Sequence, residues 1–365
     1  MKEYESIPAL KAILLKKTIK NIAVQSLNLA TLEKQMLNRK FKSCLFLGCK
    51  MSESLLQHLQ PDNFIFPVME APYEVYPNKL YSKETLYNNY DYKKPKTYNQ
   101  TLDKLVYDHC IKTGKQSDSI KETLTRRLHD QSITDALEDF LENFKPKKVV
   151  AMMGGHGLSR GDKTYRQVAE ISRELTEKGY LMVSGGGPGA MEATHLGAWL
   201  AGRSERSLTT AINILKKAPF YNDKKWLSTA YEVLKKYPKS KYQSLGIPTW
   251  LYGHEPPTPF ATHIAKYFAN SVREDGLLTI AKGGVIFAPG SAGTIQEIFQ
   301  DLTQNHYRSF GFASPMVFMN KEYWSYQRPV YPVIELMSLR GDLKNLNLGI
   351  YDTNEEVIGH IERFK

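Results

Sequence analysis

The chain has 365 residues, of which 42% are hydrophobic and 24% charged, and its formal net charge at pH 7 is +11. A chain of this length can bury a sizeable core and is long enough for two domains. It has no apolar run of the roughly 18 residues that a membrane-spanning helix needs, nor a signal peptide at its start, so we expect a cytoplasmic protein.

The positive charge favours an anionic partner, and nucleic acid and phosphorylated metabolites both stay open on this evidence. The cysteines show no paired spacing like that of a zinc site or a disulfide framework, which fits a reducing compartment. They are Cys44, Cys49 and Cys110.

Residues 1–145 are predicted to form a separate N-terminal accessory domain of mixed or unknown structure. In residues 7–49 the apolar positions change spacing, so helices and short stacked strands both stay open. Residues 73–107 are dense in Tyr, Asn, Lys and Pro, which is typical of an extended surface segment. Its interleaved Tyr and Lys could stack bases, but we favour packing on the second domain or a partner subunit, and expect no nucleic-acid partner. Residues 132–144 are predicted as an amphipathic helix.

From residue 146 to 365, short apolar or β-branched runs alternate with helical patterns. This alternation predicts an α/β fold, a Rossmann-like parallel sheet with helices on both faces. An apparent insertion covers residues 204–242. Strands are predicted within 147–155, 180–184, 245–253, 282–290 and 315–320, and helices within 166–179, 191–202, 261–281, 294–307 and 353–364. The last helix begins with a predicted capping box of Thr353 and Glu356.

Two glycine-rich loops each follow a predicted strand and precede a predicted helix. They are SGGGPGAME, residues 184–192, and APGSAGTIQE, residues 288–297. Loops at the carboxyl ends of parallel strands line the ligand crevice. Glycine lets backbone N–H groups approach an anion closely, and the following helix adds its positive dipole end. The two loops together predict a site for a phosphate ester.

The predicted substrate- and phosphate-binding residues come from these loops and from the loop after the first strand of this domain. They are Gly154, Arg160, Gly185, Gly186, Gly187, Gly189, Gly290, Ser291, Gly293 and Thr294. His156 lies in the same first loop and is a further candidate.

Two better-known phosphate motifs are absent. GLSRGDKT, residues 157–164, departs from a P-loop because Asp162 stands where the glycine before the lysine belongs. The dinucleotide fingerprint fails because Arg160 occupies the place of its third glycine. Neither an NTPase nor a nicotinamide enzyme is therefore predicted.

GGGPGAME with its alanine-rich helix, and PGSAGTIQE about a hundred residues later, resemble the LOG ("lonely guy") family. These phosphoribohydrolases, or nucleotide 5′-monophosphate nucleosidases, are often mislabelled lysine decarboxylases. The family pattern is PGGxGTxxE with RKxxM upstream, and the resemblance covers roughly residues 147–365. This chain has Ser291 for the second glycine of PGG. Glu274 replaces the lysine after Arg273, and Leu277 replaces the methionine.

The resemblance implies hydrolysis of the N-glycosidic bond of nucleoside 5′-monophosphates to base and ribose 5-phosphate, by a homodimer without metal or organic cofactor. It implies that Glu297 stabilises the positive sugar and activates water, while Arg273 orients that carboxylate or stabilises the departing base. From the residues alone, Glu297 could instead form a capping box with Thr294. The alternative function is non-catalytic binding of a nucleotide or a phosphorylated, molybdopterin-like cofactor. His254, Glu255 and His263 lack the helical spacing of metal ligands, so no metal is predicted.

Overall fold

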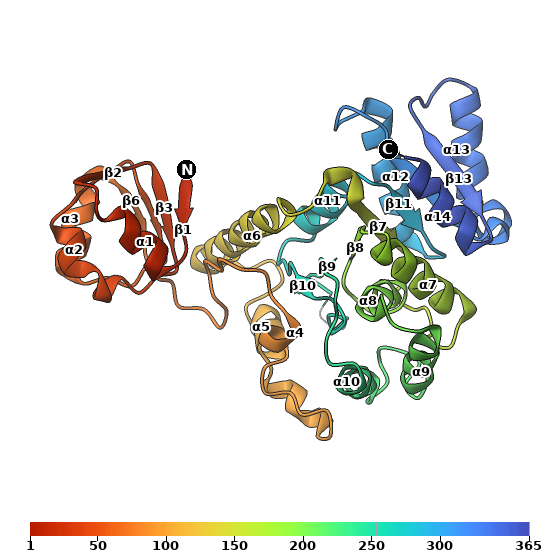
Figure 1. Cartoon of the computed structure of the whole chain (residues 1–365), viewed down its shortest axis with the longest axis horizontal. Coiled ribbons are helices and arrows are strands. Elements are labelled where there is room, and N and C mark those ends of the chain that lie inside the picture. The colour runs from red at the N-terminus through yellow and green to blue at the C-terminus, as the bar shows by residue number, and fades with distance from the viewer. Residues whose placement is uncertain (253–254, 365) are drawn as a thin grey trace. The chain divides into compact units, whose positions relative to one another are not determined.

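A computed structural model describes residues 1–252 and 255–364, and the chain divides into two compact units (Figure 1). The first unit comprises residues 1–80 and 109–139, and the second comprises residues 81–108 and 140–365. This division differs from the predicted boundary at residue 145, because residues 81–108 pack with the second unit.

The N-terminal 80 residues of the first unit form a short stack of parallel strands. The main sheet has the order β1 (Lys2–Tyr4), β3 (Ile22–Gln25), β5 (Leu45–Leu47) and β6 (Phe64–Phe66). A second sheet pairs β2 (Thr18–Lys20) with β4 (Lys40–Lys42). The connecting helices are α1 (Ile7–Ile13), α2 (Glu33–Leu37) and α3 (Glu53–Leu59). Of the two structures left open for this region, the stacked strands are the main feature.

A 22-residue repeat accounts for this stack. The apolar pattern of the first copy recurs 22 positions later and is similar to the leucine-rich form LxxLxLxx(N/C)xL, with Leu27 in the first copy and Cys49 in the second at the Asn or Cys position. The first copy is Ile19, Ile22, Val24, Leu27 and Leu29, and the second is Phe41, Cys44, Phe46, Cys49 and Met51. Both cysteines are buried, and each Sγ lies against a carbonyl of the preceding copy, Cys44 at 3.7 Å from Ile19 O and Cys49 at 3.3 Å from Val24 O. These thiols are therefore structural.

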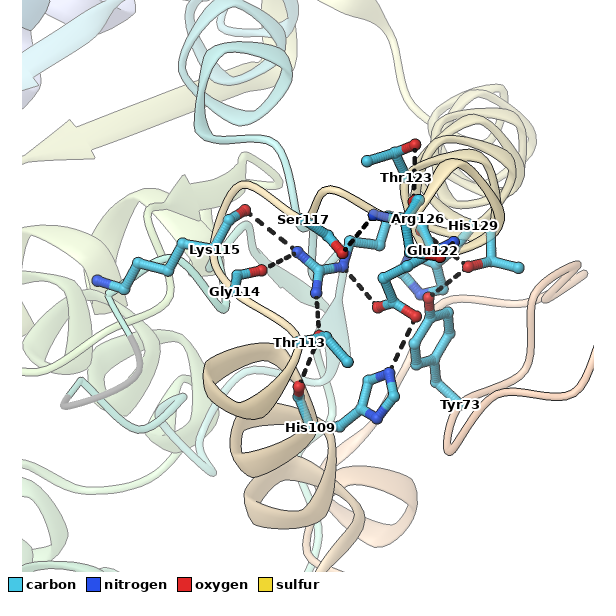
Figure 2. Close-up of polar contacts among 12 residues, drawn as sticks. Tyr73, His109, Thr113, Gly114, Lys115, Ser117, Glu122, Thr123, Arg126 and His129 are labelled. Carbon is cyan, nitrogen blue, oxygen red and sulfur yellow. Dashed lines mark hydrogen bonds and ion pairs between the residues drawn. The ribbon is translucent and has the colours of Figure 1, made fainter.

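Helices α5 (Leu102–Lys112) and α6 (Ile120–Leu141) are joined by a turn that a polar network holds in place (Figure 2). Arg126 donates to Glu122 at 2.7 Å and to the carbonyl oxygens of Gly114 and Lys115 at 2.9 and 3.1 Å. Glu122 also lies 3.0 Å from His109 Nε2. The predicted helix 132–144 is the C-terminal part of α6, which begins a further twelve residues upstream.

The second unit is built on a seven-stranded, wholly parallel sheet with helices on both faces (Figure 1). The strand order is β10-β9-β8-β7-β11-β12-β13. The strands are β7 (Val149–Met153), β8 (Leu181–Ser184), β9 (Ser244–Gly246), β10 (His263–Ile264), β11 (Val285–Phe287), β12 (Pro315–Met319) and β13 (Asn347–Tyr351). From β7 the strands are added toward one edge of the sheet up to β10, and from β11 they are added toward the other edge up to β13. The topological switch point therefore lies between β7 and β11.

The helices of the second unit are α4 (Lys83–Leu86), α7 (Lys163–Glu177), α8 (Ala190–Leu200), α9 (Glu205–Leu215), α10 (Trp226–Lys236), α11 (Asn270–Ile280), α12 (Ala292–Tyr307), α13 (Val330–Leu339) and α14 (Asn354–Arg363). Five of them, α7, α8, α11, α12 and α14, correspond to predicted helices, and α4, α9, α10 and α13 were not predicted. Helix α14 carries the predicted capping box of Thr353 and Glu356. Within the described residues, no helix has both the length and the apolar character needed to span a bilayer.

Two predicted elements differ from the structure. The strand expected over 245–253 is short, and Gly253 and His254 lie outside the described residues. The helix expected over 261–281 begins only at Asn270. The residues before it run as an extended segment alongside β9, where Ala265 N donates to Gly246 O and Tyr267 N donates to Pro248 O. These tertiary backbone bonds outweigh the local helical pattern. Strands β10 and β13 were not predicted.

The tyrosines of residues 81–108 pack within the second unit, as the favoured alternative predicted for them. Tyr87 OH donates to the carbonyl of Pro257, and Tyr90 OH lies 3.0 Å from Ser228 Oγ on α10. The ring of Tyr231 lies 5.0 Å from that of Tyr90. The segment therefore packs against the inserted helix α10 and contributes to the second unit's core.

Helix α12 carries a buried acid, Asp301, whose Oδ2 has no hydrogen-bond partner among the described residues. Burial raises the pKa of Asp301 to about 8. Between about pH 4 and pH 8 the Asp301 carboxyl is therefore protonated in the folded protein and ionised in the unfolded chain.

We expect Asp301→Asn to stabilise the protein increasingly as the pH rises from about 4 to 8, with no further gain above that. The raised pKa costs stability across this window, by at most about 1.4 kcal/mol per pH unit, and an amide removes that cost. Urea unfolding at pH 5, 6.5 and 8 measures the difference, with the exposed Asp342→Asn as control. A difference from wild type that stays constant with pH would contradict the assignment.

Candidate active site at the sheet's switch point

Three loops meet where β7, β8 and β11 end, and Gly155 joins them. Its N–H donates to Pro289 O at 3.1 Å, in the loop after β11. Its carbonyl accepts from Ala190 N at 3.2 Å, at the start of α8. Gly189 lies so close that a Cβ there would stand 2.3 Å from Gly155 O, and its φ of +67° also favours glycine. The two glycine loops therefore converge, as their positions in the sequence predict.

The three loops line a cleft of about 490 Å³ together with α11 and the start of α12. Eight of the predicted site residues line it: Gly154, Gly185, Gly187, Arg273, Ser291, Gly293, Thr294 and Glu297. Other lining residues, which include Met191, Thr249, Tyr252, Glu274 and Gln296, were not predicted as site residues. Met191, Glu274 and Gln296 lie within or beside the motifs but were given no role, and Thr249 and Tyr252 come from the irregular segment after β9, which no motif marks.

Three predicted glycines shape the turns instead of lining the cleft. Gly186 has a φ of +69°, and its carbonyl accepts from Thr258 N at 2.8 Å. Gly189 makes the close approach to Gly155 already described. At Gly290 a Cβ would stand 2.1 Å from Thr294 Oγ1, and the carbonyl accepts from Tyr323 OH at 2.6 Å. A side chain at any of these three positions would therefore clash with neighbouring atoms of the turns.

Arg160, predicted to reach the ligand, is instead part of the core, with 1% of its surface exposed. Its Nε and Nη2 donate to the two carboxylate oxygens of Glu192 on α8. Its Nη1 donates to the carbonyls of Ala218 and Trp226, both at 3.1 Å. Tyr165 OH donates to the same carboxylate at 3.0 Å. Because these partners hold the buried guanidinium in the core, Arg160 anchors the inserted helices to α8 and does not line the cleft.

We expect Glu192→Ala to lower the free energy of unfolding by about 3–5 kcal/mol, because it leaves the buried Arg160 charge unpaired. Urea denaturation gives the value. As a control, Glu362→Ala breaks an exposed pair with Lys178 and should cost less than about 1 kcal/mol. If Glu192→Ala cost no more than the control, the buried pair would not have the anchoring role inferred here.

Glu297 lies in the second turn of α12 and faces the cleft. The helix begins at Ala292 with Ser291 as its N-cap, so Thr294 is its third residue and does not cap it. This geometry removes the capping-box alternative for Glu297. Burial raises the pKa of the Glu297 carboxyl to about 7, with Arg273 opposing the rise and Glu274 adding to it. A carboxyl with a pKa near neutrality can take up and release a proton at pH 7.

Arg273 is held beside Glu297 by its neighbours on α11. Its Nε donates to Asn270 Oδ1 at 3.0 Å and its Nη2 to Glu274 Oε1 at 3.2 Å. Glu274 also accepts from Gln296 Nε2 at 2.9 Å, which ties α11 to α12. Glu274 therefore positions Arg273 by accepting its hydrogen bond. A lysine at residue 274 could not do this, because its ammonium group is only a donor.

The opposite part of the cleft carries a second pair, His156 and Glu255. His156 Nδ1 lies 3.4 Å from Glu255 Oε1, and the His156 side chain is 45% exposed. A Cβ on Gly187 would stand 3.5 Å from Glu255 Oε2, so this carboxylate lies over the second glycine loop. Sequence reasoning named both residues but gave Glu255 no role.

The parallel sheet and the position of the cleft define the second unit as a Rossmann-like α/β protein with its ligand cleft at the topological switch point. No protein-family model and no curated protein matches the chain.

Several solved structures resemble part of the chain. The molybdenum cofactor binding protein from the phototrophic bacterium Rippkaea orientalis is 14% identical, over 59% of this chain and 95% of its own, with a TM-score of 0.38. The molybdenum cofactor carrier protein from Chlamydomonas reinhardtii is 13% identical, over 59% and 96%, with a TM-score of 0.36. The structural-genomics target TM1055 is 18% identical, over 59% and 98%, with a TM-score of 0.38. Similarity at this level carries no conclusion about function.

Proposed function

We propose that the second unit hydrolyses the N-glycosidic bond of a nucleoside 5′-monophosphate to free base and ribose 5-phosphate. The observation that carries this proposal is Glu297, a carboxyl with a pKa of about 7 in the same cleft as the glycine turns and the start of α12. The cleft thus combines an anion-binding end with an acid–base group.

The phosphate is assigned to the N-terminus of α12. The first intrahelical bond there is Ile295 N to Ser291 O, so the N–H groups of residues 292–294 have no acceptor within the helix. Such groups and the helix dipole favour an anion, and the hydroxyls of Ser291 and Thr294 can add donors.

The carboxylates of the cleft do not oppose a phosphate as strongly as their number suggests. Glu274 is paired with Arg273, and Glu255 lies beside His156. The raised pKa of Glu297 keeps that group partly neutral at pH 7. Arg273 therefore compensates the charge of Glu274, and Glu297 carries only part of a negative charge at pH 7.

The proposed reaction uses the charges that develop at the sugar. Cleavage of the glycosidic bond places positive charge on the ribose ring, which the ionised Glu297 stabilises while it accepts a proton from the attacking water. Arg273 orients Glu297 and lowers the free energy of its ionised form. The departing base needs a proton or a hydrogen bond, and His156 is the group in the cleft suited to supply it.

We expect Glu297→Gln to lower kcat for base release by at least about 100-fold, because the amide accepts no proton from water. Chromatography of a panel of nucleoside 5′-monophosphates measures free base. The exposed Glu335→Gln on α13 is the matched control, and ribose 5-phosphate affinity shows whether the site persists. If wild type released no base but bound a monophosphate as tightly as Glu297→Gln, the result would favour the non-catalytic alternative.

We expect kcat/KM to rise with pH through a midpoint near 7, because the ionised form of Glu297 is the active one. Glu274→Gln should move this midpoint to lower pH, since the Glu274 charge contributes to the raised pKa of Glu297. Initial rates between pH 5 and 9 give both midpoints. A wild-type midpoint near the ordinary glutamate value of about 4.3 would argue against Glu297 as the titrating base.

A further inference from the structure

A second pocket of about 150 Å³ lies between the tyrosine-rich segment 81–108 and the inserted region 204–242, both within the second unit. Its aromatic walls are Tyr90 and Tyr98 from the segment and Tyr221 and Trp226 from the insertion. An apolar cavity of this volume accommodates a single six-membered aromatic ring. The pocket is separate from the cleft, because the two have no lining residue in common.

The aromatic walls are held in place by hydrogen bonds at their far ends. Tyr90 OH lies 3.0 Å from Ser228 Oγ, and Tyr98 OH donates to Asp103 Oδ2 at 3.1 Å. Asp103 is itself buried in an ion pair with Lys266. Because their hydroxyls are engaged elsewhere, these two tyrosines offer ring surface to the pocket. Preformed walls lower the entropic cost of binding a flat group.

The rim of the pocket is basic. Lys224 lines the pocket and is exposed, and its neighbour Lys225 is exposed as well. Pro95, which also lines the pocket, is flanked in sequence by the exposed Lys94 and Lys96. Asp223, another lining residue, supplies a carboxylate that can accept from the N–H groups of a base. An aromatic pocket with ammonium groups at its mouth suits a flat ring that carries an anion.

The pocket also adjoins the cleft. The ring of Tyr221 lies 5.6 Å from that of His156, which lines the cleft. Pro256 lines the pocket and directly follows Glu255 of the cleft. A ligand in the pocket would therefore contact Tyr221, which packs against His156, and Pro256, which follows Glu255.

We propose that this pocket is a second nucleotide site, in which a nucleobase stacks among the four aromatic rings and its phosphate pairs with Lys224 and the neighbouring lysines. The recognised chemistry is a base carrying a phosphate, either a free mononucleotide or a unit of a single strand. This inference does not depend on hydrolysis at the cleft.

The test uses isothermal titration of the full-length Glu297→Gln protein with UMP, whose base is a single six-membered ring, with and without saturating ribose 5-phosphate to occupy the cleft. We expect ribose 5-phosphate to leave one UMP site, and Tyr221→Ala or Lys224→Glu, added to Glu297→Gln, to weaken that site by about tenfold or more. Tyr326→Ala, 81% exposed, and Lys239→Glu, also exposed, are matched controls and should bind as before.

The outcomes separate this proposal from the proposed hydrolysis. Loss of all UMP binding in ribose 5-phosphate, or a remaining site indifferent to both pocket substitutions, would overturn the second site. An absence of base release by wild type would leave it standing. Titration with an eight-residue single-stranded oligouridylate identifies the source: tighter, strongly salt-dependent binding indicates a strand, and equal binding per site indicates the free nucleotide. Because Lys224 is exposed, the Lys224→Glu protein should fold, so it tests the site even if Tyr221→Ala fails to fold.

Discussion

The candidate site depends on the two backbone hydrogen bonds of Gly155. One joins the loop after β7 to the loop after β11, and the other joins it to the start of α8. Because β7 and β11 flank the switch point, these bonds are what bring two glycine turns, far apart in sequence, into one cleft. The absence of a side chain at Gly189 allows the close approach, since a Cβ there would overlap the Gly155 carbonyl.

The electrostatics of the cleft follow from how each charge is compensated. Arg273 is shared between Glu274, to which it donates, and Glu297, whose pKa it lowers against the larger effect of burial. Glu274 fixes Arg273 in place and also connects α11 to α12 through Gln296.

Two segments outside the recognisable core of the second unit are secured by buried ion pairs. Arg160 and Glu192 hold the inserted helices, and Asp103 and Lys266 hold the tyrosine-rich segment. Buried pairs contribute little net stability but are costly to break, so they fix the place of a segment more than they stabilise the fold. The aromatic pocket exists because both segments are held in this way.

The sequence by itself determined the α/β alternation, the glycine loops and the candidate carboxylate. These signals are local, since each depends on residues adjacent in the chain, such as Pro289 to Glu297. The 22-residue repeat was also readable from Ile19 and Phe41 onward, although it was not recognised. Only the tertiary structure decided the role of Arg160, whose partner lies 32 residues away, and the extended path of residues 263–267, whose hydrogen bonds go to the last residue of β9 and the segment after it. The raised pKa of Glu297 likewise arises from burial, which no spacing of residues reveals.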